Sequence, residues 1–222
     1  MTTVDGGGPP AVELTRRPSL RADVSQALRT AIVTGQLRPG QVYSAPKLAV
    51  RFGVSATPVR EAMLELVKDG LLETVPNKGF RIVEVSERDM DEIAALRGLL
   101  EPPAVAEVAR AGDRERVRTL RPAAEAIVAA AGAGDLIGYL QADLDFHIGL
   151  LGLLGNRRLV GIVRDLRAQT RLYGLTRLAE SGRLTASAAE HLDLLDLVEA
   201  GDAAAAEALM RQHIGHTRGI WA

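Results

Sequence analysis

The 222-residue sequence contains no cysteine, which excludes disulfide bonds and thiolate metal ligands. Aromatic residues are scarce, at 3%, although hydrophobic residues of all kinds make up 47%, enough to bury a real core. No apolar run approaches the roughly 20 residues of a membrane-spanning helix, and no basic-then-apolar signal pattern opens the chain. The sequence therefore predicts a soluble, cytoplasmic protein with no membrane segment.

Charge is unevenly distributed along the chain. Residues 1–85 contain 11 Lys and Arg against 8 Asp and Glu, a net charge of +3, whereas residues 86–222 contain 16 against 20, a net charge of −4. All three lysines, Lys47, Lys68 and Lys78, lie in the first part. This asymmetry is a modest indication that the N-terminal part binds a polyanion.

Glycine and proline divide the N-terminal part into short elements. The opening MTTVDGGGPP cannot form a packed element, so residues 1–18 are predicted to be a flexible leader. Apolar residues then recur at helical spacing over residues 19–35. Two further helices are predicted, APKLAVRF with Ser44 as its cap and ATPVREAMLELVKDG with Ser55 or Thr57 as its cap, and the turn GVS joins them.

Two β-like runs, LLETV and FRIVEV, follow these helices and are joined by PNKG, a sequence typical of a hairpin turn. Helix, short helix, tight turn, helix and hairpin, in this order over residues 19–85, predict a winged helix-turn-helix domain with a two-stranded wing. In that fold the third helix can lie in the DNA major groove, and the hairpin tip can reach phosphate or the minor groove.

Polar and basic residues at the ends of these elements are candidate DNA contacts. Arg60, near the start of the third helix, can donate two hydrogen bonds to O6 and N7 of guanine. Ser55 and Thr57 are better placed for phosphate oxygens, and Lys78 lies at the hairpin tip, where Gly79 frees the backbone to approach DNA. The alternative for Arg60 is an ion pair with a surface acid, such as a glutamate of its own helix.

Residues 28–86 resemble the DNA-binding domain of GntR-type bacterial transcription regulators. The resemblance is carried by the patterns G-x-L-x-P-G, LA-x-x-x-GVS-x-TPVREA, L-x-x-x-GL and PN-x-G. The family usually has two arginines that help to hold DNA at positions where this sequence has Pro46 and Ala56. Their loss leaves Arg60, and we expect an unusual operator sequence or affinity. The substitutes that the sequence offers are Lys47, Arg51 and Lys78.

Residues 86–222 are predicted to form an all-helical bundle. The sequence SERD at its start has the form of a capping box, and breaks at Gly, Pro and Asp divide the segment into six or seven helices. Pro102 and Pro103 should kink or split the first helix, and Pro122 is expected to break the second. A bundle of this size can hold a pocket in its core. The helices are expected at 86–110, 113–132, 135–154, 156–180, 184–200 and 202–220.

The sequence has only four histidines, and three predicted helices each carry at least one. His147 shares a helical face with Asp143, one turn earlier in DLDFH. With His191 and His213, this pair makes a set of three imidazoles and one carboxylate, which suits Zn²⁺, Ni²⁺ or Mn²⁺ and leaves coordination positions open. The alternative is an intrahelical ion pair beside ordinary core or surface histidines. We expect a surface role for His216.

Residues 86–222 also resemble the helical effector domain of the FadR branch of GntR regulators. The similarity lies in DLDFH and in EHLDLLDLVEAGDAAAAEALMRQH, where the metal-binding members carry their ligands. The resemblance implies that the same roles fall to Asp143, His147, His191 and His213.

Arg97 and Glu101 lie one helical turn apart in LRGLLEPPA, which resembles the family's R-x-x-L-E-P segment. One interpretation is a local ion pair of small energy. The other is that Arg97 lines a pocket and binds a carboxylate together with the metal, because a guanidinium matches a carboxylate in bidentate geometry. Tyr139, one turn before Asp143, is either a further pocket donor or a packing residue.

These features together predict a DNA-binding transcription regulator, in the first place a repressor, that binds a palindromic operator as a homodimer. A small carboxylate effector would bind at the metal and shift the protein between two arrangements. One alternative is a metalloenzyme that uses the ion to activate water or polarise a carbonyl. That alternative needs a general acid or base, for which Glu101 is the only candidate outside the ligands, and it gives the N-terminal domain no role. The other alternative is a regulator whose pocket binds its effector without a metal.

Overall fold

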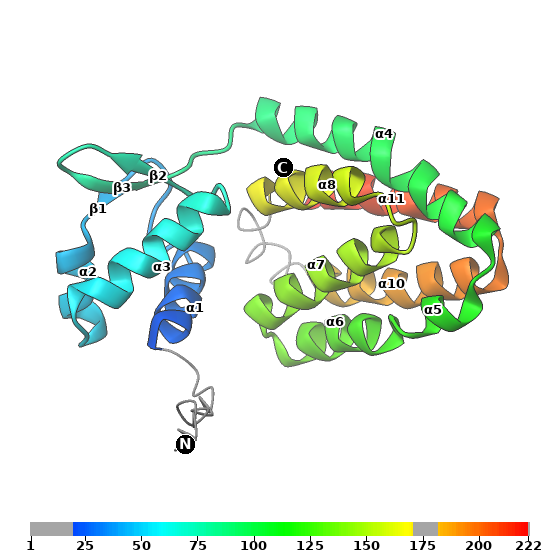
Figure 1. Cartoon of the computed structure of the whole chain (residues 1–222), viewed down its shortest axis with the longest axis horizontal. Coiled ribbons are helices and arrows are strands. Elements are labelled where there is room, and N and C mark those ends of the chain that lie inside the picture. Colours follow the sequence, from blue (N-terminus) through cyan, green and yellow to red (C-terminus); the bar gives the residue numbers. More distant parts are fainter. Residues whose placement is uncertain (1–19, 171–181, 222) are drawn as a thin grey trace, which may run out of the picture.

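The computed structural model describes residues 20–170 and 182–221, which form a small N-terminal unit and a larger helical unit (Figure 1). The predicted leader, residues 1–18, lies outside the described residues. The fold is mostly helical and begins with a winged helix-turn-helix, as predicted. Its elements are α1 (Leu20–Val33), β1 (Val42–Tyr43), α2 (Ala45–Phe52), α3 (Ala56–Lys68), β2 (Leu72–Val75) and β3 (Gly79–Ile82).

The two helices of the helix-turn-helix begin and end at the residues that the local sequence indicates. Pro46 lies in the first turn of α2, where its missing N–H has no intrahelical partner to lose, and Gly53 ends that helix in the left-handed conformation, with φ of 67°. Buried apolar residues of α1 and α2 pack against those of α3. Ser44 and Ser55 occupy the N-cap positions of α2 and α3, as predicted, although neither makes a side-chain cap hydrogen bond.

The wing has three strands where the sequence predicts two. β2 and β3 form the expected antiparallel hairpin, with Leu72 opposite Ile82, and β1 pairs with the other edge of β3. A two-residue strand is too short to show an alternating pattern, so the sequence could not reveal β1. Its position explains Gly79, where φ is 130° and a Cβ atom would lie 2.3 Å from the carbonyl oxygen of Tyr43.

The helical unit contains no strand within the described residues, as predicted. A capping box opens it, because Ser86 N donates to Asp89 Oδ2 (2.9 Å) and Asp89 N donates to Ser86 Oγ (3.1 Å). The break expected at Pro122 is found between α5 and α6. Part of the predicted helix 156–180 lies outside the described residues. The helices are α4 (Glu87–Ala111), α5 (Arg114–Arg118), α6 (Arg121–Ala133), α7 (Leu136–Gly152), α8 (Arg157–Thr170), α10 (Arg183–Ala200) and α11 (Ala203–Trp221).

The proline pair does not split α4, and this part of the prediction is wrong. Pro102 and Pro103 lie inside a helix that runs unbroken over 25 residues. A proline in a helix interior costs about 3 kcal/mol, so packing must offset the lost hydrogen bonds. The residues that follow the prolines supply that packing, since α4 is buried along α11 for much of its length (Figure 1). Tertiary contacts here override a local signal.

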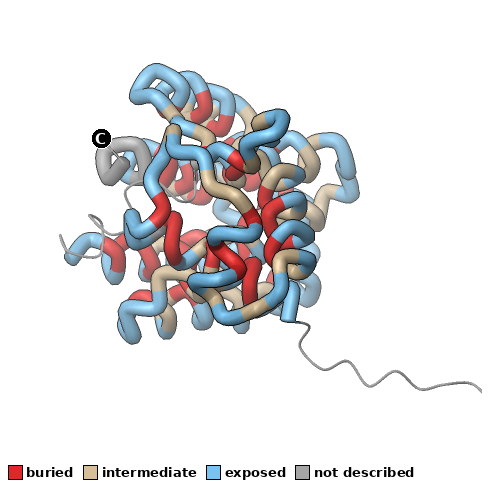
Figure 2. The backbone as a smooth tube through the Cα atoms, turned by 90° about the vertical axis from the view of Figure 1, so that its left-hand side faces the viewer, coloured by how far each residue is buried: buried red, intermediate tan, exposed pale blue. Residues whose placement is uncertain are grey.

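Buried residues gather in the interior (Figure 2). In addition, α7 of the helical unit contacts α1 of the N-terminal unit. The helix that carries Asp143 and His147 therefore also touches the N-terminal unit. None of the helices within 20–170 and 182–221 combines the length and apolarity needed to cross a bilayer.

Candidate metal centre

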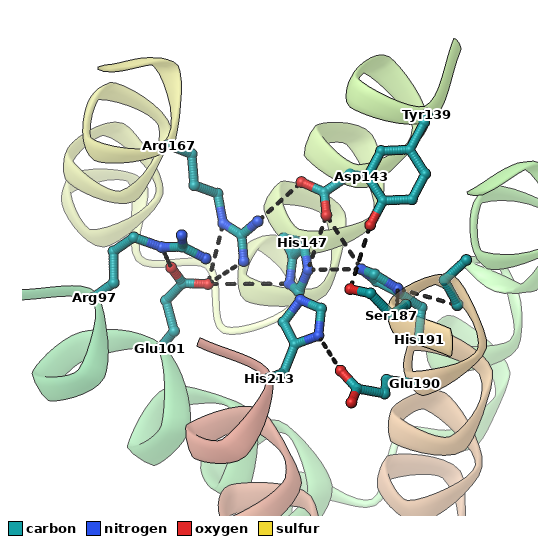
Figure 3. Close-up of polar contacts among 11 residues, drawn as sticks. Arg97, Glu101, Tyr139, Asp143, His147, Arg167, Ser187, Glu190, His191 and His213 are labelled. Atoms are coloured by element: carbon teal, nitrogen blue, oxygen red, sulfur yellow. Dashed lines mark hydrogen bonds and ion pairs between the residues drawn. The ribbon is translucent and has the colours of Figure 1, made fainter. Parts of the chain in front are cut away.

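Four side chains from three helices meet in the interior of the helical unit (Figure 3). Asp143 and His147 come from α7, His191 from α10 and His213 from α11, and one donor atom of each lies within 4.8 Å of the others. The three histidines are between 1% and 4% exposed. The structure thus brings together the four residues that the sequence analysis selected as one set.

Hydrogen bonds fix the proton of His191 on the nitrogen that faces away from this cluster. His191 Nδ1 lies 3.0 Å from the carbonyl oxygen of Ser187 and 3.2 Å from that of Ala188. Carbonyl oxygens only accept, so Nδ1 donates and the lone pair of the neutral ring is on Nε2. That lone pair faces Asp143 Oδ1 at 3.2 Å and His147 Nε2 at 3.1 Å. Because a lone pair and a carboxylate oxygen repel one another, either the ring proton of His147 on Nε2 or a cation must lie between these groups.

Glu190 orients His213 in the same manner. Its Oε2 accepts a hydrogen bond from His213 Nδ1 at 2.7 Å, which leaves the Nε2 lone pair of His213 for the cluster. A carboxylate behind a histidine is the common support of metal-binding histidines, because it fixes the tautomer and the ring orientation. The other oxygen of Glu190 is 2.7 Å from Nδ1 of His216, which is exposed as predicted but is joined to the cluster through Glu190.

The electrostatics of the cluster keep its members in the metal-binding protonation states. Burial, reinforced by the charge of Arg167, lowers the pKa of His147 well below 6.5. Burial also lowers the pKa of His213 to about 4, against the opposing effect of Glu190. Burial favours the neutral form of Asp143, but Arg167 and the neighbouring histidines outweigh it and lower its pKa well below 3.8. At neutral pH His147 and His213 are thus neutral imidazoles and Asp143 is a carboxylate, the forms that bind metal.

The donor distances also fit a metal ion. Two ligand atoms that each lie about 2.1 Å from one ion are separated by roughly 3 to 3.5 Å. The nitrogens of His147 and His191 are 3.1 Å apart, and Asp143 Oδ1 lies 3.2 Å from the second and 3.6 Å from the first. Three imidazole nitrogens and one carboxylate oxygen suit Zn²⁺, Ni²⁺ or Mn²⁺. The residues present are therefore compatible with a divalent ion in chemistry and in spacing.

A buried network of two arginines and one glutamate adjoins the cluster. Arg97 Nε donates to Glu101 Oε1 (2.6 Å), and Arg167 donates to Glu101 Oε2 through Nε (3.1 Å) and Nη2 (2.5 Å). Arg167 Nη1 also donates to Asp143 Oδ2 at 3.0 Å, so this guanidinium connects the network to the cluster (Figure 3). Burial opposes the charge of Glu101, but the two guanidiniums prevail and lower its pKa.

Arg167 was absent from the sequence-based site. The signal available was weak: Leu159, Val163 and Arg167 recur every four residues on α8, which places an arginine on the stripe that buries Val163. Such an arginine either extends to solvent or pairs in the interior, and the sequence cannot distinguish these outcomes. The structure shows the second, with Arg167 only 3% exposed.

Arg97 and Tyr139 both lie in this interior. Arg97 forms the predicted ion pair with Glu101, although in a buried setting, and its Nη2 is the one buried side-chain nitrogen or oxygen of the described residues with no hydrogen-bond partner. The hydroxyl of Tyr139 lies 3.5 Å from Ser187 Oγ, and its ring belongs to the hydrophobic core. An orphaned guanidinium nitrogen beside a candidate metal site is a place where an added acceptor would gain a strong hydrogen bond.

The candidate DNA contacts lie at the opposite end of the molecule, on α2, α3 and the wing (Figure 1). Arg60 makes no ion pair with any described residue, and Glu65, a possible partner on its helix, instead lies 3.8 Å from Arg21. The alternative interpretation of Arg60 as half of a surface pair is therefore not observed. Gly79 is half-buried, and the other candidates are exposed: Lys47, Arg51, Ser55, Thr57, Arg60 and Lys78.

The chain matches known families over both units. Residues 20–82 match the bacterial regulatory proteins of the gntR family, and residues 92–216 match the FCD domain. The chain belongs to the GntR family of regulators with an FCD domain. It is therefore a transcription regulator, and residues 20–82 form its DNA-binding domain, called the head below. FCD domains often bind metal.

Individual relatives support the same assignment. An uncharacterised HTH-type regulator from the TAR-I ttuE-ttuC′ intergenic region of Agrobacterium vitis is 40% identical over 124 residues, 54% of this chain and 72% of that one. The transcriptional repressor GlaR of Escherichia coli is 28% identical, covering 84% of this chain and 89% of that one. The solved structure of E. coli McbR/YncC superposes with a TM-score of 0.70 at 26% identity, covering 92% of this chain and 98% of that one.

Proposed function

We propose that this GntR regulator is a metal-dependent repressor that binds a palindromic operator as a homodimer and responds to a small carboxylate. The observation that carries the proposal is the meeting of Asp143, His147, His191 and His213, with the Nδ1 protons of His191 and His213 engaged outside the cluster. These four residues would hold the ion, Zn²⁺, Ni²⁺ or Mn²⁺. When bound, the ion supplies a fixed positive charge with open coordination positions for an anionic ligand.

The effector class follows from the cations around the cluster. Arg97 Nη2 has no hydrogen-bond partner among the residues that the structure describes, and Arg167 links Asp143 to Glu101, so a carboxylate beside the metal would meet guanidinium donors. Tyr139 adds a hydroxyl to the same interior. This chemistry favours small hydroxy, keto, sugar or dicarboxylic acids. It disfavours the metalloenzyme alternative, because Glu101 is held as a carboxylate between two guanidiniums and is poorly suited to accept a proton.

The N-terminal residues support DNA binding by contacts of two kinds. Arg60 is free to reach base edges from α3, and Lys78 is exposed at the wing tip. Lys47 and Arg51 on α2 are exposed for phosphate contacts and would substitute for the arginines replaced by Pro46 and Ala56. Ser55, Thr57 and the backbone at Gly79 complete this surface.

Exposed aliphatic side chains on the helical unit support self-association. Leu96 and Leu99 of α4 are 48% and 71% exposed, and Ile162 of the neighbouring α8 is 52% exposed. Exposed aliphatic side chains on two helices that contact each other are typical of an interaction surface. A twofold axis through such a surface would place two heads on a palindromic operator.

Metal analysis tests the central claim. The purified protein, incubated with Zn²⁺, Ni²⁺ or Mn²⁺ and then desalted, is expected to retain about one ion per chain by mass spectrometry. The double variant His147→Ala/His191→Ala should lose the ion. His216→Ala is the matched control, because it removes an exposed imidazole of the same helix as His213 and should keep the ion. Wild-type protein that stays metal-free under all three conditions would reject the metal and leave the metal-free pocket as the alternative.

A DNA experiment tests the regulatory claim separately. An operator is first selected from a pool of random duplexes, and binding is then measured for the wild type and Arg60→Ala. Representative hydroxy, keto, sugar and dicarboxylic acids are added to the metal-loaded complex, and at least one class should change operator affinity. Arg97→Gln should weaken that response while the protein still binds DNA. Chemical turnover of an added acid by the metal-loaded protein would instead favour the enzyme alternative.

A further inference from the structure

A cavity of about 210 Å³ lies where the two units of the chain meet, separate from the residues of the metal centre. The N-terminal unit contributes Arg29 of α1 together with Asp69 and Leu71, which follow α3. The helical unit completes the wall from α7 and α8. Any molecule in this cavity would touch both the DNA-binding head and the effector domain.

The walls of this junction cavity combine an apolar surface with excess positive charge. Leu71, Leu140 and Leu144 supply apolar surface. Arg29 is neutralised by Asp69, with which it forms a close ion pair. Arg164 is exposed and makes no ion pair with the residues that the structure describes, so one cationic charge of the lining is uncompensated. Apolar side chains beside a guanidinium that lacks an ion-pair partner suit an anion with an apolar body.

The size of the cavity limits what it can hold. Pockets for drug-sized ligands are typically about 300 to 1,000 Å³. A cavity of about 210 Å³ therefore suits a small acid with a compact apolar body. A phosphate or a metal ion would leave the leucine walls without a partner, and an uncharged hydrocarbon would leave Arg164 without one.

The same two helices line both the cavity and the metal centre, but with different side chains. α7 directs Asp143 and His147 to the cluster and contributes Leu140 and Leu144 to the cavity. α8 contributes Arg167 to the first and Arg164 to the second. A ligand at the junction would therefore not need the metal. The affinity of the cavity for this ligand would nevertheless depend on the position of the head relative to the helical unit. By linkage, the bound ligand would favour the position that it binds best.

We propose that the junction cavity is a second, metal-independent binding site for a small monocarboxylate with an apolar body. The carboxylate pairs with Arg164, and the apolar body lies against Leu71, Leu140 and Leu144. This inference does not rest on the proposed metal centre.

Calorimetric titration with benzoate tests the site. Benzoate should bind the wild type and the metal-site variant His147→Ala/His191→Ala with similar affinity, whereas benzylamine, of similar shape and opposite charge, should not bind. Arg164→Gln should weaken benzoate binding by about tenfold or more, since a hydrogen-bonded ionic contact is lost. Arg158→Gln, which removes an exposed arginine of the same helix outside the cavity, is the matched control and should leave the affinity unchanged.

A second variant protects the test against misfolding. Leu144→Trp should fill the cavity and abolish benzoate binding. If the wild type retains metal, metal retention by Leu144→Trp and Arg164→Gln shows that the helical unit of each variant is folded. Circular dichroism serves the same purpose if the wild type does not. The proposal is overturned if benzoate produces no heat with the wild type, or if its binding is lost in the metal-site variant and unaffected by Arg164→Gln. The second result would place benzoate at the metal centre alone.

Discussion

The two ends of the molecule hold their functional side chains in opposite environments. In the DNA-binding head the candidate contacts are exposed, mostly close in sequence, and the basic ones carry no ion pair within the described residues. In the helical unit the candidate functional groups come from five helices, α4, α7, α8, α10 and α11, are mostly buried and contact one another. The head keeps its charges free for an external polyanion, whereas the helical unit satisfies its own charges internally.

This difference sets what each set of residues contributes to the fold. An exposed cation stabilises its own domain little, so its removal should affect DNA binding and leave the free energy of unfolding nearly unchanged. A buried charge depends on its partners, and removal of one partner leaves the other uncompensated in a medium of low polarity. In the helical unit, ligand binding and stability should therefore change together.

The largest effect is expected for Glu101→Ala, which leaves the buried guanidiniums of Arg97 and Arg167 without their shared carboxylate. The free energy of unfolding should fall by about 3 to 5 kcal/mol in urea denaturation. Glu92→Ala is the matched control, because Glu92 pairs with Arg88 at the same spacing on the same helix but at the surface, and should cost at most about 0.5 kcal/mol. Equal losses for the two variants would refute the contrast between buried and exposed pairs.

The metal-free protein should lose stability as the pH falls from about 6.5 toward 4. The pKa of His213 is about 4 in the fold, so the unfolded chain takes up the proton first and unfolding becomes easier on acidification. Each histidine with a lowered pKa reduces the free energy of unfolding by about 1.4 kcal/mol per pH unit of acidification within this window. The pKa of His147 is also lowered, so His147 acts in the same direction. Urea denaturation at several pH values should show a shallower slope for His213→Gln. A dependence of unfolding free energy on pH equal to that of the wild type would contradict a lowered pKa for His213 in the fold.

Glu190→Gln should weaken metal binding by about 10-fold to 100-fold, because the amide orients His213 less firmly than the carboxylate does. Competition with a chelator measures the affinity. Glu207→Gln, which alters an exposed pair with Arg211 on α11, is the control and should have no effect. A Glu190 variant with wild-type affinity would show that the carboxylate does not support the ion.

The smallest effect is expected for Lys78→Ala at the wing tip. Operator affinity should fall modestly, and the slope of log affinity against log salt should decrease by about one, as for the loss of one phosphate contact. The unfolding free energy and metal content should stay at wild-type values, since Lys78 is exposed. If the operator affinity and the salt slope of this variant equal those of the wild type, Lys78 does not contact the operator.

Local sequence determined most of the head. The bounds of α2 follow from Pro46 and Gly53, and the β2–β3 hairpin follows from PNKG, because each of these signals acts through the backbone of a few neighbouring residues. The capping box at Ser86 and the break at Pro122 are signals of the same kind. The set of Asp143 and three histidines was also visible, because helical spacing and rare residue types limit the candidates.

Only the tertiary structure decided the features that depend on distant parts of the chain. Strand β1 exists because β3 lies beside it, and α4 passes through two prolines because α11 buries it. Arg167 and Glu190 belong to the site only because α8 and α10 bring them to Asp143 and His213. Likewise, the spacing of Arg97 and Glu101 is the same for a weak surface pair as for a buried one. Burial decides between them, and burial is produced by packing among helices far apart in sequence.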